Sequence, residues 1–456
     1  MREPPIHTGT ELRARAEQKW IWRVGLVAVL MVSVVSILHR AAGQTSTMTL
    51  GKGENRLGDM NRTWEARHIS PKAEEAGYFG SAIEVIEDVT GDKTPELLVG
   101  APRESPNGSA KSGRVYLLNG IGGLPIRSIR SPDPEKNGRF GSALAQVPDL
   151  NDDGRKEMLI GASGEDIGSV EGAGTVYVLH GGNGTMLGEL RSPRPVPHGR
   201  FGAAVTALGA PTGSGTSGRE DKSVEIAIGA PGEQVEKSQG PSTDTLQGAG
   251  RVYRFVIQRG GRGSNDIQSL KTGTIESPSP ETSGHFGVSL AAEGRSQDVS
   301  GLGLTIGADE SPMGVRNAGR LYFTGPDGEI VEGSLRSPAP VKHGRFGASV
   351  SHVPDVDDDG GPELLVGAPV ETPIGRDRTA GGGGTVYLLD GRGKEVKRRY
   401  TLPNAHRNSF FGMAIGNRID RDGDEGRRWP HPEILVGSAA ENRQKRAAGV
   451  IYRFDL

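Results

Sequence analysis

Short apolar stretches separated by Gly and Pro recur along the chain from about residue 64 onward. Each group has the same order: a small-residue alternating run such as "SALAQV", a nearly continuous apolar run such as "ELLVG", a run such as "TVYLL", and a short segment such as "GELRSP". Alternation with period two predicts half-buried strands, and the continuous run predicts a strand buried on both faces. The pattern therefore predicts a series of four-stranded sheets.

This unit occurs six times, and every copy begins with Phe-Gly. The copies start at Phe79, Phe140, Phe201, Phe286, Phe346 and Phe411, at spacings of 61, 61, 85, 60 and 65 residues. A period above about 40 residues with four short strands per unit is typical of a β-propeller. We expect an all-β, six-bladed propeller; seven blades are disfavoured because the long interval holds no further Phe-Gly.

The two ends of the repeat region predict how the ring closes. A segment of the fourth-strand type, "WEARHISP" from Trp64, precedes the first unit, and the sixth unit stops after its third strand at Leu456. We expect the N-terminal strand to complete the sixth blade, which would remove the free sheet edges of an open array.

The N-terminal region predicts a membrane segment. Residues 24–38, "VGLVAVLMVSVVSIL", are uncharged, and from Trp20 the stretch is 19 residues long, or about 28 Å as a helix, against about 30 Å of hydrocarbon. Basic residues precede it, which predicts a cytoplasmic N-terminus. The predicted divisions are a tail at 1–23, a membrane anchor or uncleaved signal at 24–38, a linker at 39–62 and the propeller at 63–456.

A signal peptide cleaved near Ala41 is the alternative to an anchor. Either way, the bulk of the chain is expected outside the cytoplasm, in the periplasm or at the cell surface. It is expected as a single-pass membrane protein with the anchor, or as a secreted protein after cleavage.

Composition narrows the function classes. Gly and Pro make up 100 of the 456 residues, the formal net charge is −2, and there is no cysteine. The near-neutral charge gives no general attraction to nucleic acid. The absence of cysteine excludes disulfides, thiol catalysis and cysteine-bound zinc.

Acidic loops between the first and second strands predict cation sites. Two charges about 4 Å apart repel by roughly 4 kcal/mol at a dielectric of 20, so the crowding implies either outward-pointing side chains or a bound cation. In the pattern D-x-D-x-D-G-x-x-E, alternate side chains turn inward and Gly permits the bend, an all-oxygen arrangement that suits Ca²⁺. The strong candidates are Asp355, Asp357, Asp359 and Glu363 in unit five, and Asp149, Asn151, Asp153 and Glu157 in unit two.

Unit one is a weaker candidate, with Asp88, Thr90, Asp92 and Glu96 as ligands but Lys93 in place of glycine. Unit six offers Asp420, Asp422 and Asp424, while an insertion displaces its acidic closer, Glu433. Units three and four are expected to have lost the ligand set. The alternative for each loop is a solvated acidic turn. We expect structural ion sites, because a fully ligated ion leaves no open position for a substrate.

Phe-Gly, an acidic loop and Gly-Ala-Pro together form the pattern of the FG-GAP repeat. Over residues 64–456 the chain resembles the β-propeller at the head of integrin α subunits. The resemblance implies calcium in loops of the lower face and partners docking on the upper face. The sequence departs from that family in having six repeats, no cysteine and nothing after the propeller, so it implies an extracellular recognition platform without an integrin-like heterodimer or signalling role.

The residue before Phe-Gly is basic in four units, which suggests a partner-binding ring. These residues are Arg139, Arg200, His285 and Arg345, and His198 and His343 lie two positions before their arginines. We hypothesise that the ring favours an acidic protein or glycan. The alternative is that arginine recurs because it makes the same contact in each blade. Unit three also carries two long insertions, and the composition of 258–273 is typical of disorder.

The leading expectation is a non-enzymatic platform for binding or adhesion, with Ca²⁺ as its cofactor and a protein or glycan as its partner. The first alternative is an exported enzyme or the accessory domain of a hydrolase, because FG-GAP repeats also resemble the accessory propeller of a phospholipase. No G-x-S-x-G motif or His-rich metal motif supports catalysis, and we expect no catalytic residues. A scaffold subunit of an extracytoplasmic complex is the other alternative.

Overall fold

The computed structural model describes residues 67–456 except 121, 210–222, 240–241, 261–265, 294–302, 357–360, 372–381, 392, 394, 403–407, 419–432 and 442–445. All of these described residues fall in the second of the chain's two compact units, Met48–Leu456. The predicted tail, membrane segment and linker lie outside the described residues. Within the described part, no helix has the length and apolarity needed to cross a membrane.

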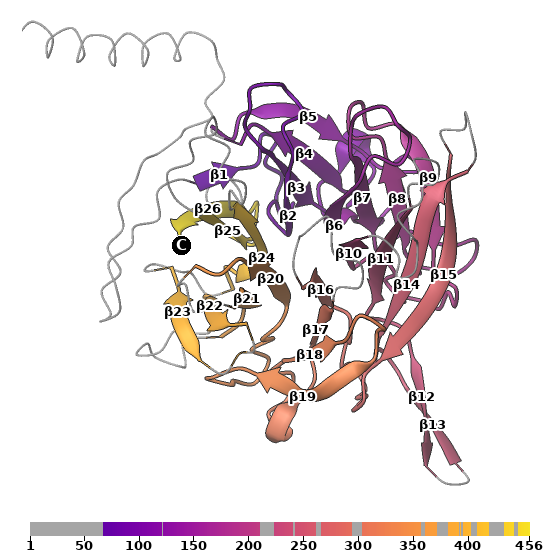
Figure 1. The fold of residues 1–456 in the computed structure, drawn as a ribbon, viewed down its shortest axis with the longest axis vertical. Helices are drawn as coiled ribbons and strands as arrows, with labels where there is room; N and C mark the ends of the chain where they lie inside the picture. The colour runs from indigo at the N-terminus through magenta and orange to yellow at the C-terminus, as the bar shows by residue number, and fades with distance from the viewer. Residues whose placement is uncertain are drawn as a thin grey trace, which may run out of the picture. The chain divides into compact units, whose positions relative to one another are not determined.

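Six antiparallel four-stranded sheets are arranged around a common centre (Figure 1). The first is β2 (Ala82–Ile86), β3 (Glu96–Ala101), β4 (Arg114–Leu118) and β5 (Pro125–Ile129); the second is β6 (Phe140–Val147), β7 (Glu157–Ala162), β8 (Thr175–Leu179) and β9 (Met186–Arg191). The third is β10 (Ala204–Gly209), β11 (Ser223–Ala230), β14 (Arg251–Arg259) and β15 (Ile267–Glu276); the fourth is β16 (Ser289–Ala292), β17 (Leu304–Ala308), β18 (Arg320–Thr324) and β19 (Ile330–Arg336).

The fifth sheet is β20 (Ser349–Val353), β21 (Glu363–Ala368), β22 (Thr385–Asp390) and β23 (Val396–Tyr400). The sixth is β24 (Phe411–Arg418), β25 (Glu433–Ser438), β26 (Val450–Asp455) and β1 (Arg67–Ile69). Two short 3₁₀ turns, Pro106–Gly108 and Pro312–Gly314, follow β3 and β17. The first strands of neighbouring blades contact one another all the way round the ring, including β24 with β2. The predicted six-bladed propeller is confirmed.

The ring closes as the sequence predicts. Strand β1 pairs antiparallel with β26, with His68 opposite Ile451 and Ile69 opposite Val450. Just beyond β1, the Ser70 hydroxyl donates to the Glu104 carboxylate in blade one at 2.7 Å. One short segment therefore completes the last blade and also ties it to the first.

The core lies between blades, where each Phe-Gly unit meets the next sheet. All six Phe-Gly phenylalanines have no exposed surface, and Phe79 packs edge-on against Tyr116 at 5.8 Å between ring centroids. The second strands β3, β7 and β21 are buried along their whole length, as their continuous apolar runs predict. A Cβ on Gly437 would lie 2.0 Å from the carbonyl oxygen of Gly80, so the expected close backbone approach between blades is present.

A buried glutamate after each second strand is a feature that the sequence interpretation missed. In blade two, the Glu165 carboxylate accepts hydrogen bonds from the Ser131 hydroxyl at 2.6 Å and the Tyr177 hydroxyl at 2.7 Å. Burial raises the pKa of Glu165 to about 7 despite these bonds. Equivalent Ser–Glu–Tyr contacts occur in blades one, three and four, at Glu104, Glu233 and Glu310.

The insertions in unit three are more ordered than their composition suggests. The expected disorder across 258–273 is wrong for the residues of this segment that the structure describes, because β14 and β15 pair from Arg251–Glu276 to Arg259–Ile267. Most of β15 is exposed, so backbone pairing supplies the order that side-chain burial does not. The other insertion contains a hairpin of β12 (Val235–Gln239) and β13 (Ser242–Leu246).

Candidate functional site

The β6–β7 loop of blade two brings three carboxylates together. Asp149, Asp153 and Glu157 each offer an oxygen, and these oxygens all lie within 4.8 Å of one another. Gly154, at the sixth position of the loop, has φ of +82° and donates its N–H to Asp149 at 3.0 Å. The third-position residue, Asn151, is buried and accepts the Asp153 N–H at 3.1 Å.

Glu157 shows that this loop fits a cation. Its side chain has no exposed surface, and one oxygen accepts the Leu150 N–H at 2.8 Å while Oε1 is buried without a hydrogen-bond partner. Burial, and then the charges of Asp149 and Asp153, raise the Glu157 pKa to about 7. An orphaned buried oxygen facing two other carboxylates is unfavourable unless a positive charge satisfies it. The donor set is oxygen only, as hard divalent cations prefer.

Blade one repeats the carboxylate cluster, with Thr90 at the loop position that Asn151 holds in blade two. Oxygens of Asp88, Asp92 and Glu96 also lie within 4.8 Å of one another. Here Thr90 Oγ1 donates to Glu96 at 2.9 Å, so a hydroxyl satisfies the oxygen that is orphaned in blade two. Lys93 has φ of +66° at the glycine position; a left-handed conformation in a non-glycine residue costs of order 1–3 kcal/mol.

Blade five keeps the same closing contact. The Val356 N–H donates to Glu363 at 3.0 Å, as Leu150 does to Glu157. Glu363 is buried and Asp355 is exposed. Asp357 and Asp359 lie outside the described residues, as do Asp420, Asp422 and Asp424 of blade six, so the structure does not place these candidate ligands.

In blade six, Glu433 keeps the place of the closing glutamate in its strand, while its displacement from Asp420, Asp422 and Asp424 stays a prediction because residues 419–432 lie outside the described part. Glu433 begins β25 four residues before Gly437, just as Glu157 precedes Gly161; the insertion lies before it. Its carboxylate pairs with Arg453, and Arg418 approaches to 3.6 Å. Two guanidinium groups thus occupy the carboxylate that closes the loop.

Blade three also keeps its glutamate, although the sequence interpretation treated the ligand set there as lost. Glu225 lies four residues before Gly229, and Arg254 donates to both of its oxygens at 2.8 Å. Arg254 and Arg453 share one place in the third strand, in "VYRF" and "IYRF", where blades one and two have Leu117 and Val178. An arginine at this place in the third strand is the sequence feature that could have indicated the ion pair with the glutamate. Blade four has Gly303 at the glutamate position.

Two contacts show which strand connections lie on the same face as the acidic loops. His180, at the start of the β8–β9 connection, lies 2.6 Å from Asp153, and Asn119 in the β4–β5 connection donates to Asp92 at 2.9 Å. The acidic loops therefore share the lower face with the third-to-fourth strand loops. The Phe-Gly loops lie on the opposite, upper face.

On the upper face, the six residues before Phe-Gly share one backbone conformation. Their φ angles run from +49° to +58°, and the backbone N–H of Arg200, for example, donates to Gly172 at 3.1 Å. The backbone conformation at this position is therefore the same in all six blades. It does not require arginine, because Tyr78 and Phe410 adopt the same conformation.

The three arginines of the predicted ring converge on the upper end of the central channel. Arg139, Arg200 and Arg345 all line one chamber of about 280 Å³. Arg345 contacts Asp309 at 3.2 Å, and His285 contacts the same carboxylate at 3.1 Å. His198 and His343 are exposed and do not line the chamber.

Arg200 is the least compensated of these groups. Its Nε is buried without a hydrogen-bond partner. Burial, and then the charges of Arg139 and Arg345, lower the Arg200 pKa to about 10. By contrast, burial at Asp309 is outweighed by the Arg345 charge together with the His285 and Arg345 contacts, which lower the pKa of that carboxyl to about 2.

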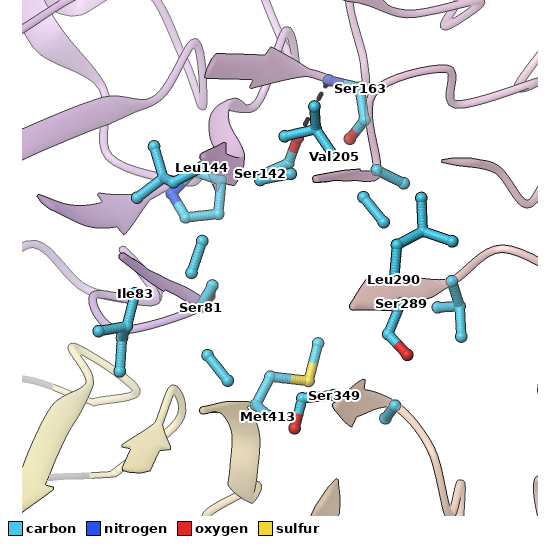
Figure 2. A pocket seen from close by; sticks show the side chains of 18 of the residues that line it. Ser81, Ile83, Ser142, Leu144, Ser163, Val205, Ser289, Leu290, Ser349 and Met413 are labelled. Atoms are coloured by element: carbon cyan, nitrogen blue, oxygen red, sulfur yellow. Dashed lines mark hydrogen bonds between the residues drawn. The ribbon is translucent and has the colours of Figure 1, made fainter. Parts of the chain in front are cut away.

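A ring of apolar side chains divides the channel. Ile83, Leu144, Val205, Leu290, Val350 and Ile415 line both the upper chamber and a lower one of about 380 Å³; we call these six residues the collar. Figure 2 shows four of them, Ile83, Leu144, Val205 and Leu290, around one opening. Each lies four residues after its phenylalanine, so the collar is a direct product of the repeat.

The lower chamber is more polar but places few catalytic groups together. Among its described lining residues, His352 is the one histidine and Glu84 the one carboxylate. His352 lies 2.9 Å from Thr305 Oγ1, and burial lowers its pKa to about 4. A neutral, buried histidine held by a neighbouring blade is consistent with a structural role.

These features define a class: a six-bladed propeller with acidic inter-strand loops on one face and a basic mouth on the other. The FG-GAP repeat model matches residues 79–118, 140–179 and 346–389. The chain is an FG-GAP β-propeller similar to that of integrin alpha chains, which confirms the resemblance stated above.

Among similar proteins, human integrin alpha-11 is 33% identical over 37% of this chain and 14% of its own length. Drosophila melanogaster integrin alpha-PS5 is 29% identical over 44% of this chain and 19% of its own. Mouse phosphatidylinositol-glycan-specific phospholipase D is 25% identical over 81% of this chain and 54% of its own. The chain therefore spans between about one seventh and about half of the length of these relatives.

Proposed function

We propose that this chain is an exported, calcium-stabilised binding propeller, attached to a membrane by its N-terminal segment, that recognises a protein or glycan partner on its upper face. The observation that carries the proposal is the convergence of Arg139, Arg200 and Arg345 at one end of the channel. A cluster of like charges lined by low-dielectric walls concentrates its field outward and attracts oppositely charged partners. The similarity to integrin alpha chains supports a role in binding or adhesion.

Calcium has a structural role in this proposal. Asp149, Asp153 and Glu157 would hold the ion, with Asn151 as a further oxygen ligand, and the ion would neutralise carboxylates that otherwise repel one another. The equivalent blade-one residues would hold a second ion. These loops lie on the face opposite the basic mouth, so the ion would stabilise the blades without contacting the partner.

The proposal is non-enzymatic. A hydrolase, or an accessory domain of one, is the alternative that the phospholipase D similarity supports. That similarity covers about half of the relative's length and does not carry its activity to this chain. A scaffold role in an extracytoplasmic complex would use the same upper face.

Binding of immobilised heparin and immobilised poly-glutamate by the full-length protein tests the proposal. Charge reversal in the triple variant R139E/R200E/R345E is expected to abolish salt-sensitive binding to at least one of these ligands. The matched control reverses three exposed arginines outside the chamber, Arg127, Arg191 and Arg194. Equal losses in both triple variants, with the fold intact by circular dichroism, would show that no specific mouth exists.

A further inference from the structure

The upper chamber combines a basic rim with an apolar interior. Arg139, Arg200 and Arg345 come from the residues before Phe-Gly, at the upper end. Farther along the same strands, the lining changes to small residues and then to the collar. The small residues include alanines, such as Ala204 and Ala348, and serines, such as Ser289 and Ser349, whose hydroxyls donate to backbone carbonyls of the next blade. Because each inner strand runs from the upper to the lower face, charge lies at the entrance and apolar surface lies beneath it.

The positive charge at the rim is not balanced within the part of the chain that the structure describes. Asp309 is shared between Arg345 and His285. No ion pair or side-chain hydrogen bond reaches Arg139 or Arg200 from the described residues, and Arg200 Nε is buried without a partner. A buried donor left unsatisfied is costly, and a guanidinium fork matches a carboxylate in two parallel bonds.

The shape of the chamber limits what enters it. Its volume of about 280 Å³ lies just below the roughly 300–1,000 Å³ of pockets for drug-sized ligands. The collar forms its inner end and is shared with the lower chamber, so a ligand that enters from the basic upper face meets the collar with a projecting group. One or two peptide side chains fit this description better than a continuous glycan, which needs an open groove along its length.

We propose that the upper chamber binds an acidic peptide segment of a protein partner, with an aliphatic side chain against the collar and a neighbouring carboxylate between Arg139 and Arg200. This inference rests on the proposed function and narrows its partner to an acidic protein. Charge complementarity selects the carboxylate, and the apolar interior selects the aliphatic neighbour.

The test measures fluorescence anisotropy of labelled peptides with the full-length protein in 1 mM calcium. The probe is fluorescein-Gly-Gly-Leu-Glu-Gly-Gly, compared with versions in which Gln replaces Glu or Ala replaces Leu. We expect the Gln version to bind at least tenfold more weakly and the Ala version severalfold more weakly. R139Q and R200Q should each weaken the Leu-Glu peptide about tenfold or more.

Two further variants separate binding from folding. Arg191→Gln is the matched control, because Arg191 is an exposed arginine on β9 that pairs with Glu189 at 2.9 Å; it should leave peptide affinity unchanged. Ala348→Leu fills the chamber from its wall without removing a charge. It should weaken the Leu-Glu peptide and not the Ala version, and an unchanged melting temperature would show that the fold is intact.

Equal affinity of R200Q and wild type, or of the Glu and Gln peptides, would overturn the inference. A heparin tetrasaccharide measured in parallel distinguishes failure of the peptide inference from failure of the proposed function. If the tetrasaccharide binds in an Arg200-dependent way and no peptide does, the basic mouth stands and the peptide inference fails. If neither probe binds, both fail.

Discussion

Replacing Asp149 by Asn should have opposite effects with and without calcium. At 4.8 Å, the largest separation among the loop oxygens of Asp149, Asp153 and Glu157, two full charges repel by about 3 kcal/mol at a dielectric of 20. Removing one charge relieves part of this repulsion, so in chelator the Asp149→Asn variant should be at least as stable as wild type. The Asp152 and Gly154 N–H groups bind different oxygens of Asp149, so Asn keeps one of these hydrogen bonds and loses the other to water. That loss is about 1 kcal/mol, which is less than the repulsion relieved.

With calcium present, the order should reverse. A ligand at a hundredfold excess over its Kd stabilises the folded state by about 2.7 kcal/mol. For a propeller of about 390 residues, an unfolding entropy of about 2.1 cal/mol/K per residue converts this to roughly 3 °C in Tm for each occupied site. Asp149→Asn should lose one such increment of the calcium-induced rise.

Differential scanning calorimetry of the full-length protein in 1 mM calcium and in chelator is the assay. Asp152→Asn is the matched control, because this carboxylate belongs to the same loop but lies 3.4 Å from Arg259 and outside the ligand cluster. A calcium-induced rise in Tm that Asp149→Asn leaves undiminished, or that Asp152→Asn diminishes equally, would refute ligation by Asp149. No response in wild type would leave the loops as solvated acidic turns.

Three further outcomes test the blade contacts. Arg254→Leu leaves Glu225 buried and unpaired and should cost about 3–5 kcal/mol in urea unfolding, whereas adding Glu225→Leu should recover most of it; no recovery would contradict the ion-pair account. Because the pKa of Glu165 is raised to about 7, its contribution is fully present below about pH 4.5 and is lost as pH rises through 7. The stability difference between wild type and Glu165→Gln should therefore shift by up to about 3 kcal/mol between pH 4.5 and 8 in denaturant titrations, and a flat difference would contradict burial. Replacing Arg67–Ile69 by Gly-Pro-Gly removes β1 and exposes the edge of β26. Size-exclusion chromatography should then show self-association. The same change at 243–245 in the β12–β13 hairpin is the control and should not cause self-association.

The repeat pattern predicted the architecture because each blade is encoded locally. Phe-Gly, the continuous second strand and the Gly-x-Val-Tyr strand fix three strands in every unit, and the segment around His68 supplies the missing fourth. The strand pairing at 258–259 and 267–273 was not predictable from composition, because β15 is mostly exposed and is held by backbone pairing. Such pairing depends on the neighbouring strand, which a window of sequence does not contain.

The site was predictable where it is local and not where it depends on distant residues. The ligand spacing in 149–157 identified three carboxylates that the structure brings together. The partners of Glu225 and Glu433 come from third strands 20 to 29 residues later in the chain, so reading each loop alone missed them. The recurring arginines were visible in the repeat. Their convergence on one chamber depends on how the six blades close into a propeller, and so does the position of His198 and His343 outside that chamber.

The same carboxylate is therefore neutralised in two ways, and this leads to a count of ions. In blades one, two and five the closing glutamate accepts a loop N–H and faces the acidic loop; in blades three and six an arginine in the third strand binds it. A guanidinium and a divalent cation would compete for this carboxylate, so we expect three calcium ions for each chain, and not four, despite the aspartates at 420, 422 and 424. Native mass spectrometry of the full-length protein gives this number directly, and Arg453→Leu should raise it to four. A count of four in wild type would show that the Arg453 contact does not exclude the ion.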